Sequence, residues 1–169
     1  MVSRIAGVDS QTARDFTGFF QSEYPRLVRA CLLLTGDVAA AEDLAQDAMT
    51  RVYERWGKVS RMRSPDGYLY RTALNLNRKR LRHLAVRSRR SVVERSSPDP
   101  LAVAEDRMEA LHAVSLLSRP QREALVLVDW LGFDPEEAGR LLGIEAVSVR
   151  VRLHRARVAL RRRLGGTHA

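Results

Sequence analysis

The chain has 169 residues, of which 45% are hydrophobic, and a formal net charge of +9. This length and hydrophobic content exclude wholesale disorder and allow one domain or two small helical ones. The positive charge favours a polyanionic partner, nucleic acid before membrane, and the single cysteine, Cys31, excludes an intrachain disulfide and fits a reducing compartment.

Helical spacing of apolar residues predicts two helices in the first third of the chain. The first covers residues 15–34 and contains Pro25, which should restart or kink it. The second covers residues 38–56, and its exposed side carries Asp43, Asp47, Thr50 and Glu54. Like charges at these spacings weaken an isolated helix by a few tenths of a kcal/mol each. They indicate either a dedicated contact surface or a solvated acidic face balanced by neighbouring arginines.

A third helix is predicted over residues 64–84, with Ser64 to Asp66 as its start signal. Four polar residues share its outward side: Arg71, Asn75, Arg78 and Arg82. Tyr68 and Tyr70 lie near its start, and aromatic rings beside arginines can hold unstacked bases of a single strand. Both tyrosines could instead pack in the core. Asn75 costs helix propensity in mid-helix, and a base edge is one partner that could offset this cost.

The pattern loosens at residues 87–106, which contain serines, prolines and a switch from basic to acidic residues. We interpret this segment as a flexible linker between a domain at residues 10–86 and a second domain at residues 107–165. Helical spacing returns at residues 108–117 and 118–131, and these two helices should support the segment that follows.

Residues 134–163 have the order and spacing of a helix-turn-helix. Asp134 and Pro135 predict the start of a first helix, and Gly143 its left-handed end. The second helix should bury one face, formed by Val149, Leu153, Ala156, Leu160 and Leu164. Its outward face combines basic and apolar residues: Val147, Arg150, Val151, His154, Arg155, Val158 and Arg162. Such a face suits a DNA major groove, although an isolated arginine-rich helix can also be merely solvated.

Catalytic and metal-binding patterns are missing from the sequence. The four histidines lack the paired spacing of a zinc site, and neither a phosphate-binding glycine loop nor a nucleophile elbow is present. We therefore expect no metal, no cofactor and no enzymatic activity. The sequence also lacks a leader-like apolar stretch and any apolar run long enough to span a bilayer, which predicts a cytoplasmic protein without membrane insertion.

The N-terminal half resembles region 2 of the sigma-70 family, in particular the small two-domain sigma factors of the extracytoplasmic-function (ECF) type. Residues 43–47, DLAQD, resemble the part of region 2 that docks on core RNA polymerase. The resemblance implies that the polymerase-binding residues are Asp43, Gln46, Asp47, Thr50 and Glu54. Residues 68–75, YLYRTALN, resemble the family segment that melts and captures the minus-ten promoter element. The implied minus-ten residues are Tyr68, Arg71, Asn75, Arg78, Lys79 and Arg82.

The C-terminal half resembles region 4 of the same family, at residues 117–125 and 143–157. The resemblance implies that the residues facing the minus-thirty-five element are Ser148, Arg150, Val151, His154, Arg155 and Arg157. Two departures are a tyrosine, Tyr68, in place of the usual tryptophan and Ala138-Gly139 in place of the common Ile-Ala. Because a glycine inside a helix costs up to about 1 kcal/mol against alanine, we expect a less rigid helix-turn-helix than in relatives.

The resemblance implies an all-α fold of two helical domains, a region 2 bundle and a region 4 helix-turn-helix, joined by the flexible linker. The implied function is to bind core RNA polymerase and promoter DNA and to direct transcription initiation, without catalysis. It also implies an anti-sigma factor as a further partner and a monomer in the free state. The alternative is an autonomous helix-turn-helix regulator that binds operator DNA as a dimer.

Overall fold

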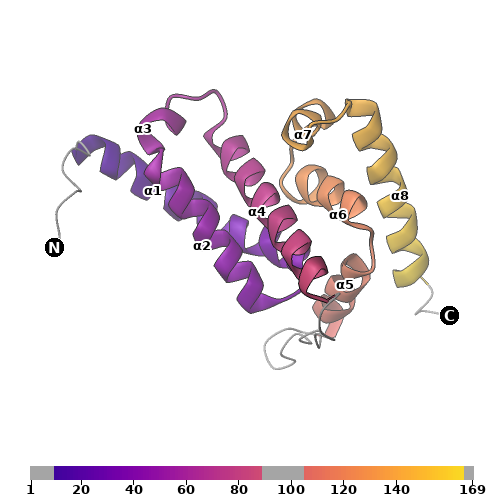
Figure 1. Ribbon diagram of the computed structural model, residues 1–169. Helices are drawn as coiled ribbons and strands as arrows, with labels where there is room; N and C mark the ends of the chain where they lie inside the picture. The colour runs from indigo at the N-terminus through magenta and orange to yellow at the C-terminus, as the bar shows by residue number, and fades with distance from the viewer. Residues whose placement is uncertain (1–9, 89–104, 166–169) are drawn as a thin grey trace.

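The computed structural model describes residues 10–88 and 105–165, and within them the side chains of residues 15–86 and 108–165. Every regular element in these residues is helical, which confirms the predicted all-α class (Figure 1). The N-terminal half consists of α1 (Ser10–Thr35), α2 (Val38–Glu54), α3 (Trp56–Val59) and α4 (Pro65–Ser88). The C-terminal half consists of α5 (Glu105–Ser115), α6 (Arg119–Leu125), the π-helical segment η1 (Val126–Trp130), α7 (Pro135–Leu142) and α8 (Ala146–Leu164).

The turn between α1 and α2 follows the predicted stop and cap. Gly36 adopts a φ of 71°, and the Asp37 carboxylate accepts a hydrogen bond of 2.7 Å from the backbone N–H of Ala40. α1 runs without a break from Ser10 to Thr35 with Pro25 inside it, so the expected restart at Pro25 is wrong, while the expected kink stays a prediction. Pro25 lies on the exposed side of α1, so the carbonyl that lacks a helical donor can bind water.

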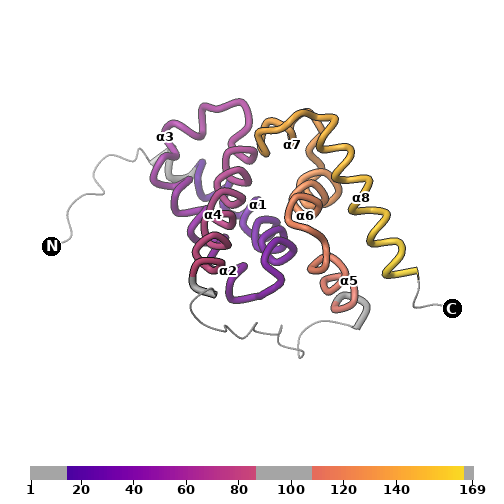
Figure 2. Tube along the Cα trace, turned by 45° about the vertical axis from the view of Figure 1, so that its right-hand side comes forward, coloured from indigo at the N-terminus to yellow at the C-terminus, as the bar shows by residue number. Residues whose placement is uncertain are grey.

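The two halves lie side by side and share one hydrophobic core. In Figure 2, α1 and α4 face α5, α6 and α7, while α8 lies at the outer edge. Leu27 and Leu74 of the N-terminal half belong to the same buried cluster as Leu127 of η1. The rings of Tyr70 and Phe133 meet edge to face across the contact, with centroids 5.8 Å apart. This seam joins segments that no local sequence pattern connects.

Cys31 and Tyr70 are buried in or beside this seam. Burial raises the pKa of the Cys31 thiol to about 12, so the thiol stays protonated and unreactive, as expected for a core cysteine. Burial also raises the pKa of the Tyr70 hydroxyl, and its hydrogen bond of 2.8 Å to the Glu23 carboxylate raises it further. Tyr70 therefore packs in the core, which was one of the two readings open at the sequence level.

A buried ion pair holds the two halves together. Arg78 of α4 donates two hydrogen bonds to the Glu123 carboxylate of α6, of 2.9 Å from Nε and 2.7 Å from Nη2. The Glu123 side chain is only 3% exposed, and Arg119 lies 3.8 Å from it as a second, weaker partner. The hydrogen bond to Glu123 raises the pKa of Arg78. Fork-shaped pairs of this kind are among the stronger polar contacts in proteins.

Two further arginines donate hydrogen bonds to backbone carbonyls across the same contact. Arg122 Nη1 donates to the Leu34 carbonyl at 2.9 Å, and Arg26 Nη2 donates to the Leu131 carbonyl at 3.2 Å. The linker predicted at residues 87–106 falls largely outside the described residues, since α4 continues to Ser88 and α5 begins at Glu105. The domain limits at residues 10–86 and 107–165 stay predictions.

Replacing Glu123 by glutamine should lower the free energy of unfolding by about 1 to 3 kcal/mol, because hydrogen bonds to a charged group are lost and Arg78 stays partly buried. Urea unfolding measures this change, and Glu42→Gln, a matched loss of charge on exposed α2, should change it little. In a double-mutant cycle with Arg78→Gln, a coupling energy near zero between positions 78 and 123 would show that the pair does not hold the halves together.

Candidate promoter-DNA and polymerase interfaces

The helix-turn-helix has the geometry that the sequence predicts. The Asp134 carboxylate accepts a hydrogen bond of 2.7 Å from the backbone N–H of Glu137, and the Glu137 side chain accepts from the backbone N–H of Asp134 at 3.4 Å. This reciprocal capping begins α7. Gly143 ends the helix with a φ of 72°, in the left-handed region. The chain then enters α8 at Ala146.

Gly139 has a packing role that the sequence did not reveal. A Cβ atom added at this position would lie 2.7 Å from the backbone oxygen of Ile144, which is closer than van der Waals contact allows. The Ile144 N–H donates a hydrogen bond of 3.0 Å to the Gly139 carbonyl. The glycine therefore permits the turn to fold back tightly onto α7.

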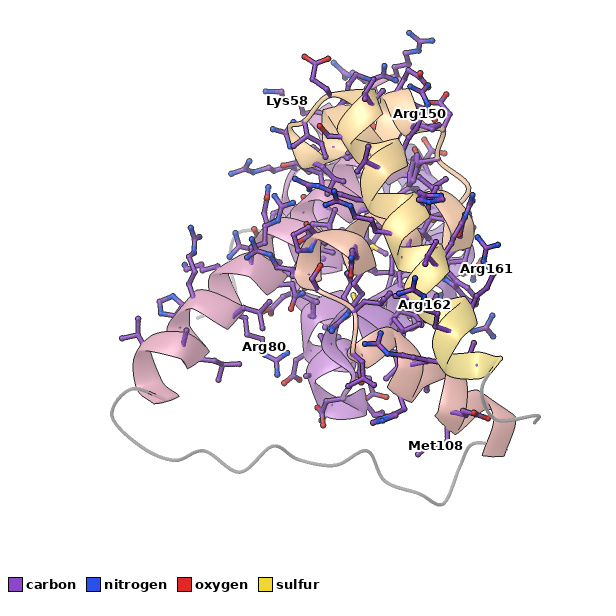
Figure 3. The ribbon with its side chains drawn as sticks, turned by 90° about the vertical axis from the view of Figure 1, so that its right-hand side faces the viewer. Lys58, Arg80, Met108, Arg150, Arg161 and Arg162 are labelled. Carbon is purple, nitrogen blue, oxygen red and sulfur yellow. The ribbon has the colours of Figure 1, made fainter. Side chains whose placement is uncertain are left out.

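α8 buries one face and exposes the other. Val149, Leu153 and Ala156 are buried as predicted, Leu160 is half-buried, and Leu164 at the end of the helix is exposed. Six of the seven predicted outward residues are exposed, and Val158 is half-buried; the exposed ones are Val147, Arg150, Val151, His154, Arg155 and Arg162. Figure 3 shows α8 toward the viewer, with Arg150 near its start and Arg161 and Arg162 near its end. The exposed face is continuous along the helix.

Two arginines of this face are paired with carboxylates of the supporting helices. The Arg150 guanidinium forms a short ion pair with Glu136 of α7. Arg157 binds Asp129 of η1 through Nε at 3.0 Å and Nη2 at 2.5 Å, and this hydrogen bond raises the pKa of Arg157. Because both pairs are exposed, they contribute little to stability, but they fix where the two guanidinium groups lie.

The predicted minus-thirty-five residues thus occupy different parts of the α8 surface. At about 100° per residue, Arg150 and Arg157 fall on one edge of the exposed face and Arg155 on the opposite edge. Ser148 lies beyond Arg155 and is half-buried. The centre of the face holds Val147, Val151 and His154 and, further along the helix, the half-buried Val158. Cationic groups therefore border a centre that is mainly apolar.

α2 presents the predicted acidic stripe to solvent. All five predicted polymerase-binding residues are exposed: Asp43, Gln46, Asp47, Thr50 and Glu54. Among residues 15–86 and 108–165, no ion pair involves Asp43, Asp47 or Glu54. Asp47 and Glu54 nevertheless line the same groove as Arg51 and Arg55, so both interpretations of the acidic stripe stand. The stripe borders a shallow aromatic groove lined by Phe16, Phe20, Tyr24, Met49 and Tyr53, to which Gln46 and Thr50 also contribute.

Four of the predicted minus-ten residues line a second groove, between α2 and α4: Tyr68, Asn75, Lys79 and Arg82. Arg71 is exposed but is not among the residues that line the groove. Tyr68 is half-buried, and its hydroxyl accepts a hydrogen bond of 3.3 Å from Arg55. Arg51 of α2 and Arg55, the residue that follows α2, also line the groove and were missed in the sequence, although their four-residue spacing could have indicated them.

Arg78 is the exception among these residues. The sequence placed it on the outward stripe of α4, but its guanidinium points to Glu123 in the other half. Residue 78 lies on the flank of that stripe that meets α6, and a helical wheel of α4 contains no information on this neighbour. In the packed arrangement Arg78 is therefore withdrawn from the groove.

Family models match both halves of the chain. The model described as Sigma-70 region 2 matches residues 19–87, and the model described as Sigma-70, region 4 matches residues 107–160. The chain is 30% identical over 152 residues to the RNA polymerase sigma-E factor of Streptomyces avermitilis, covering 89% of this chain and 85% of that protein. The chain belongs to the sigma-70 family. Sigma factors are non-enzymatic DNA-recognition subunits of RNA polymerase, and the resemblance seen in the sequence is confirmed.

Other relatives agree with this assignment. The ECF RNA polymerase sigma factor SigL of Mycobacterium tuberculosis is 28% identical over 167 residues, which cover 95% of this chain and 94% of SigL. The sigma factor RpoE from Bartonella quintana, solved in complex with the anti-sigma factor NepR, superposes with a TM-score of 0.81 at 24% identity, covering 90% of this chain and 98% of RpoE. CnrH, solved in complex with the cytosolic domain of CnrY, gives 0.64 at 23% identity over 95% and 96% of the two chains. These likenesses show a shared fold.

Within the described residues, no three histidine, cysteine or carboxylate side chains gather where they could hold a metal ion. None of the helices that the structure describes is long and apolar enough to cross a membrane.

Gly139→Ala should destabilise the C-terminal half by about 1 to 3 kcal/mol, because the added methyl collides with the Ile144 carbonyl. Gly18→Ala is the matched control, since a Cβ at exposed Gly18 of α1 meets nothing within 4 Å. That substitution should stabilise the protein by up to about 1 kcal/mol through helix propensity alone. Urea unfolding measures the free energy of unfolding of both variants. Stabilisation by Gly139→Ala would contradict the packing role of Gly139.

Proposed function

We propose that this sigma factor binds core RNA polymerase through α2 and reads two promoter elements with two separate surfaces. α8 reads the minus-thirty-five element as duplex, and the groove between α2 and α4 holds the minus-ten element as an opened strand. One observation carries the proposal: the same chain presents a capped helix-turn-helix with an exposed basic face and, in its other half, a basic groove beside unpaired carboxylates. An autonomous regulator that binds operator DNA as a dimer requires neither the basic groove nor the exposed carboxylates of α2.

The groove between α2 and α4 has the chemistry that an unstacked strand needs. Arg51, Arg55, Lys79 and Arg82 supply positive charge for phosphates, while Asn75 offers both a donor and an acceptor to a base edge. The half-exposed ring of Tyr68 can stack on a base, which contributes about 1 to 3 kcal/mol per base. Capturing bases in this way offsets the few kcal/mol that unstacking and unpairing cost. No covalent step is required, so the chain acts without catalysis of its own.

Simultaneous reading of both elements requires the two halves to move apart. The numbering of the two elements, minus thirty-five and minus ten, places them about 25 base pairs apart. This is about 85 Å at about 3.4 Å per base-pair step. A compact chain of 169 residues has a radius of gyration of only about 15 Å. Separation of the halves breaks the Arg78–Glu123 pair and returns Arg78 to the α4 surface, where it can join the minus-ten groove.

We further propose that the free protein is a monomer in the cytoplasm, where RNA polymerase works, and that an anti-sigma factor regulates it. RpoE was solved in complex with the anti-sigma factor NepR, and CnrH in complex with the cytosolic domain of CnrY. The comparisons do not favour an autonomous regulator, because both halves match sigma-factor regions in the expected order.

Run-off transcription from a randomised promoter library tests the proposal. Core polymerase with this chain should yield transcripts whose templates share an upstream and a downstream element, whereas core polymerase alone should not. Arg155→Ala should weaken use of the upstream element and leave use of the downstream one intact, because it removes a guanidinium at the edge of the α8 reading face. Asn75→Ala should do the reverse.

A docking variant separates polymerase binding from DNA reading. Asp43→Lys should lower affinity for core polymerase by about tenfold or more without unfolding the protein, because Asp43 is exposed, belongs to the acidic stripe and is not among the residues that line the groove between α2 and α4. Glu145→Lys, an equal charge change at the start of α8, should leave that affinity near wild type. If the chain instead shifts palindromic DNA by itself as a dimer and has no effect on polymerase, the proposed function is wrong.

A further inference from the structure

The centre of the α8 reading face is apolar where an ordinary solvated helix would be polar. Val147 is 65% exposed and Val151 is 43% exposed, and they lie one helical turn apart. A single exposed valine is common on protein surfaces and indicates nothing by itself. Two on the same face of a helix that otherwise carries arginines and a histidine form a small apolar surface that water does not favour.

The arginines beside these two valines indicate which partner covers them. Arg150 and Arg157 lie along one edge of the face, each held by a carboxylate of the supporting helices, and Arg155 lies along the other edge. Guanidinium groups in two rows on either side of a helix match the two phosphate backbones that border a DNA major groove. The occupant of this face is therefore duplex DNA, and the base edges of the groove meet the strip between the rows.

The carboxylate pairs also limit which residues read bases. A guanidinium that is tied to Glu136 or Asp129 has fewer donors left for a guanine edge, and both lie at the margin of the face. The strip between the margins is where base edges come closest, and recognition helices place their N-terminal residues deepest in the groove. Val147 follows the first residue of α8 and meets that condition.

We propose that Val147 and Val151 read the C5-methyl groups of two thymines in the upstream promoter element. This rests on the proposed function. The thymine methyl is the one apolar group that an unmodified base pair presents in the major groove, so it is the group a valine can distinguish. The two side chains are about 6 Å apart along the helix axis at about 1.5 Å per residue. That is close to two base-pair steps of about 3.4 Å, so the two methyl groups should lie two positions apart.

Methyl deletion in the DNA tests this proposal. A promoter selected by the holoenzyme is synthesised with deoxyuridine in place of each upstream thymine in turn, which removes only the C5-methyl group. Holoenzyme affinity, measured by fluorescence anisotropy, should fall about three- to fivefold at two positions, the loss that burial of one methyl group implies. Val147→Ala should bind thymine and deoxyuridine equally at one of those positions, and Val151→Ala should do so at the other.

Arg155→Ala is the control, because it should weaken binding to every template while the thymine-to-deoxyuridine ratios stay as in wild type. Since Val147 and Val151 are exposed, both alanine variants should unfold at the wild-type urea concentration. An upstream element without thymine, a deoxyuridine effect at no position, or an effect that persists in both valine variants overturns the methyl-reading proposal and leaves the sigma function standing. Failure of the holoenzyme to select any promoter overturns the proposed function itself.

Discussion

The arrangement of this protein depends on one buried charge. Glu123 is almost fully enclosed, and a carboxylate in that position is tolerated only with a charged, hydrogen-bonded partner. The partner is Arg78, which belongs to the other half of the chain and to a stretch that the family resemblance assigns to minus-ten DNA. The same guanidinium thus satisfies Glu123 in the packed form and becomes available to DNA when the halves part. Arg119, already 3.8 Å from Glu123, can neutralise the carboxylate in the separated form.

The apolar seam around this ion pair stabilises the packed arrangement of the two halves relative to the separated one. Leu27, Leu74 and Leu127 are buried in one cluster while the halves are packed, and this apolar contact favours the closed arrangement of the free protein. A partner can shift that equilibrium only by binding the separated form more tightly. Polymerase and promoter contacts on three surfaces, α2, α4 and α8, together supply such a preference. Binding to one surface alone gives a smaller shift, which links promoter reading to polymerase docking.

Local sequence signals predicted the helices, the α7 cap, the Gly143 turn and the exposed acidic and basic faces, because each depends on residues within one or two turns. They did not predict contacts between residues far apart in the chain. Arg78 was placed outward because its position on the helical wheel contains no information on α6. The pairing of Arg157 with Asp129 joins residues that are 28 positions apart in the chain. In the sequence, Gly139 counts only as a cost in helix propensity. In the structure, the missing side chain leaves room for the Ile144 carbonyl. Pro25 was expected to disturb a helix that accommodates it on the solvent side.

The distance between the two halves tests the central claim, that one chain reads two promoter elements by separating its halves. Donor and acceptor dyes on Lys58→Cys of α3 and Arg161→Cys of α8 can be attached selectively, because burial keeps the Cys31 thiol protonated. Energy transfer should be high in the free protein and fall sharply when core polymerase and promoter DNA are added together. Energy transfer that stays high in a complex competent for transcription would contradict the account.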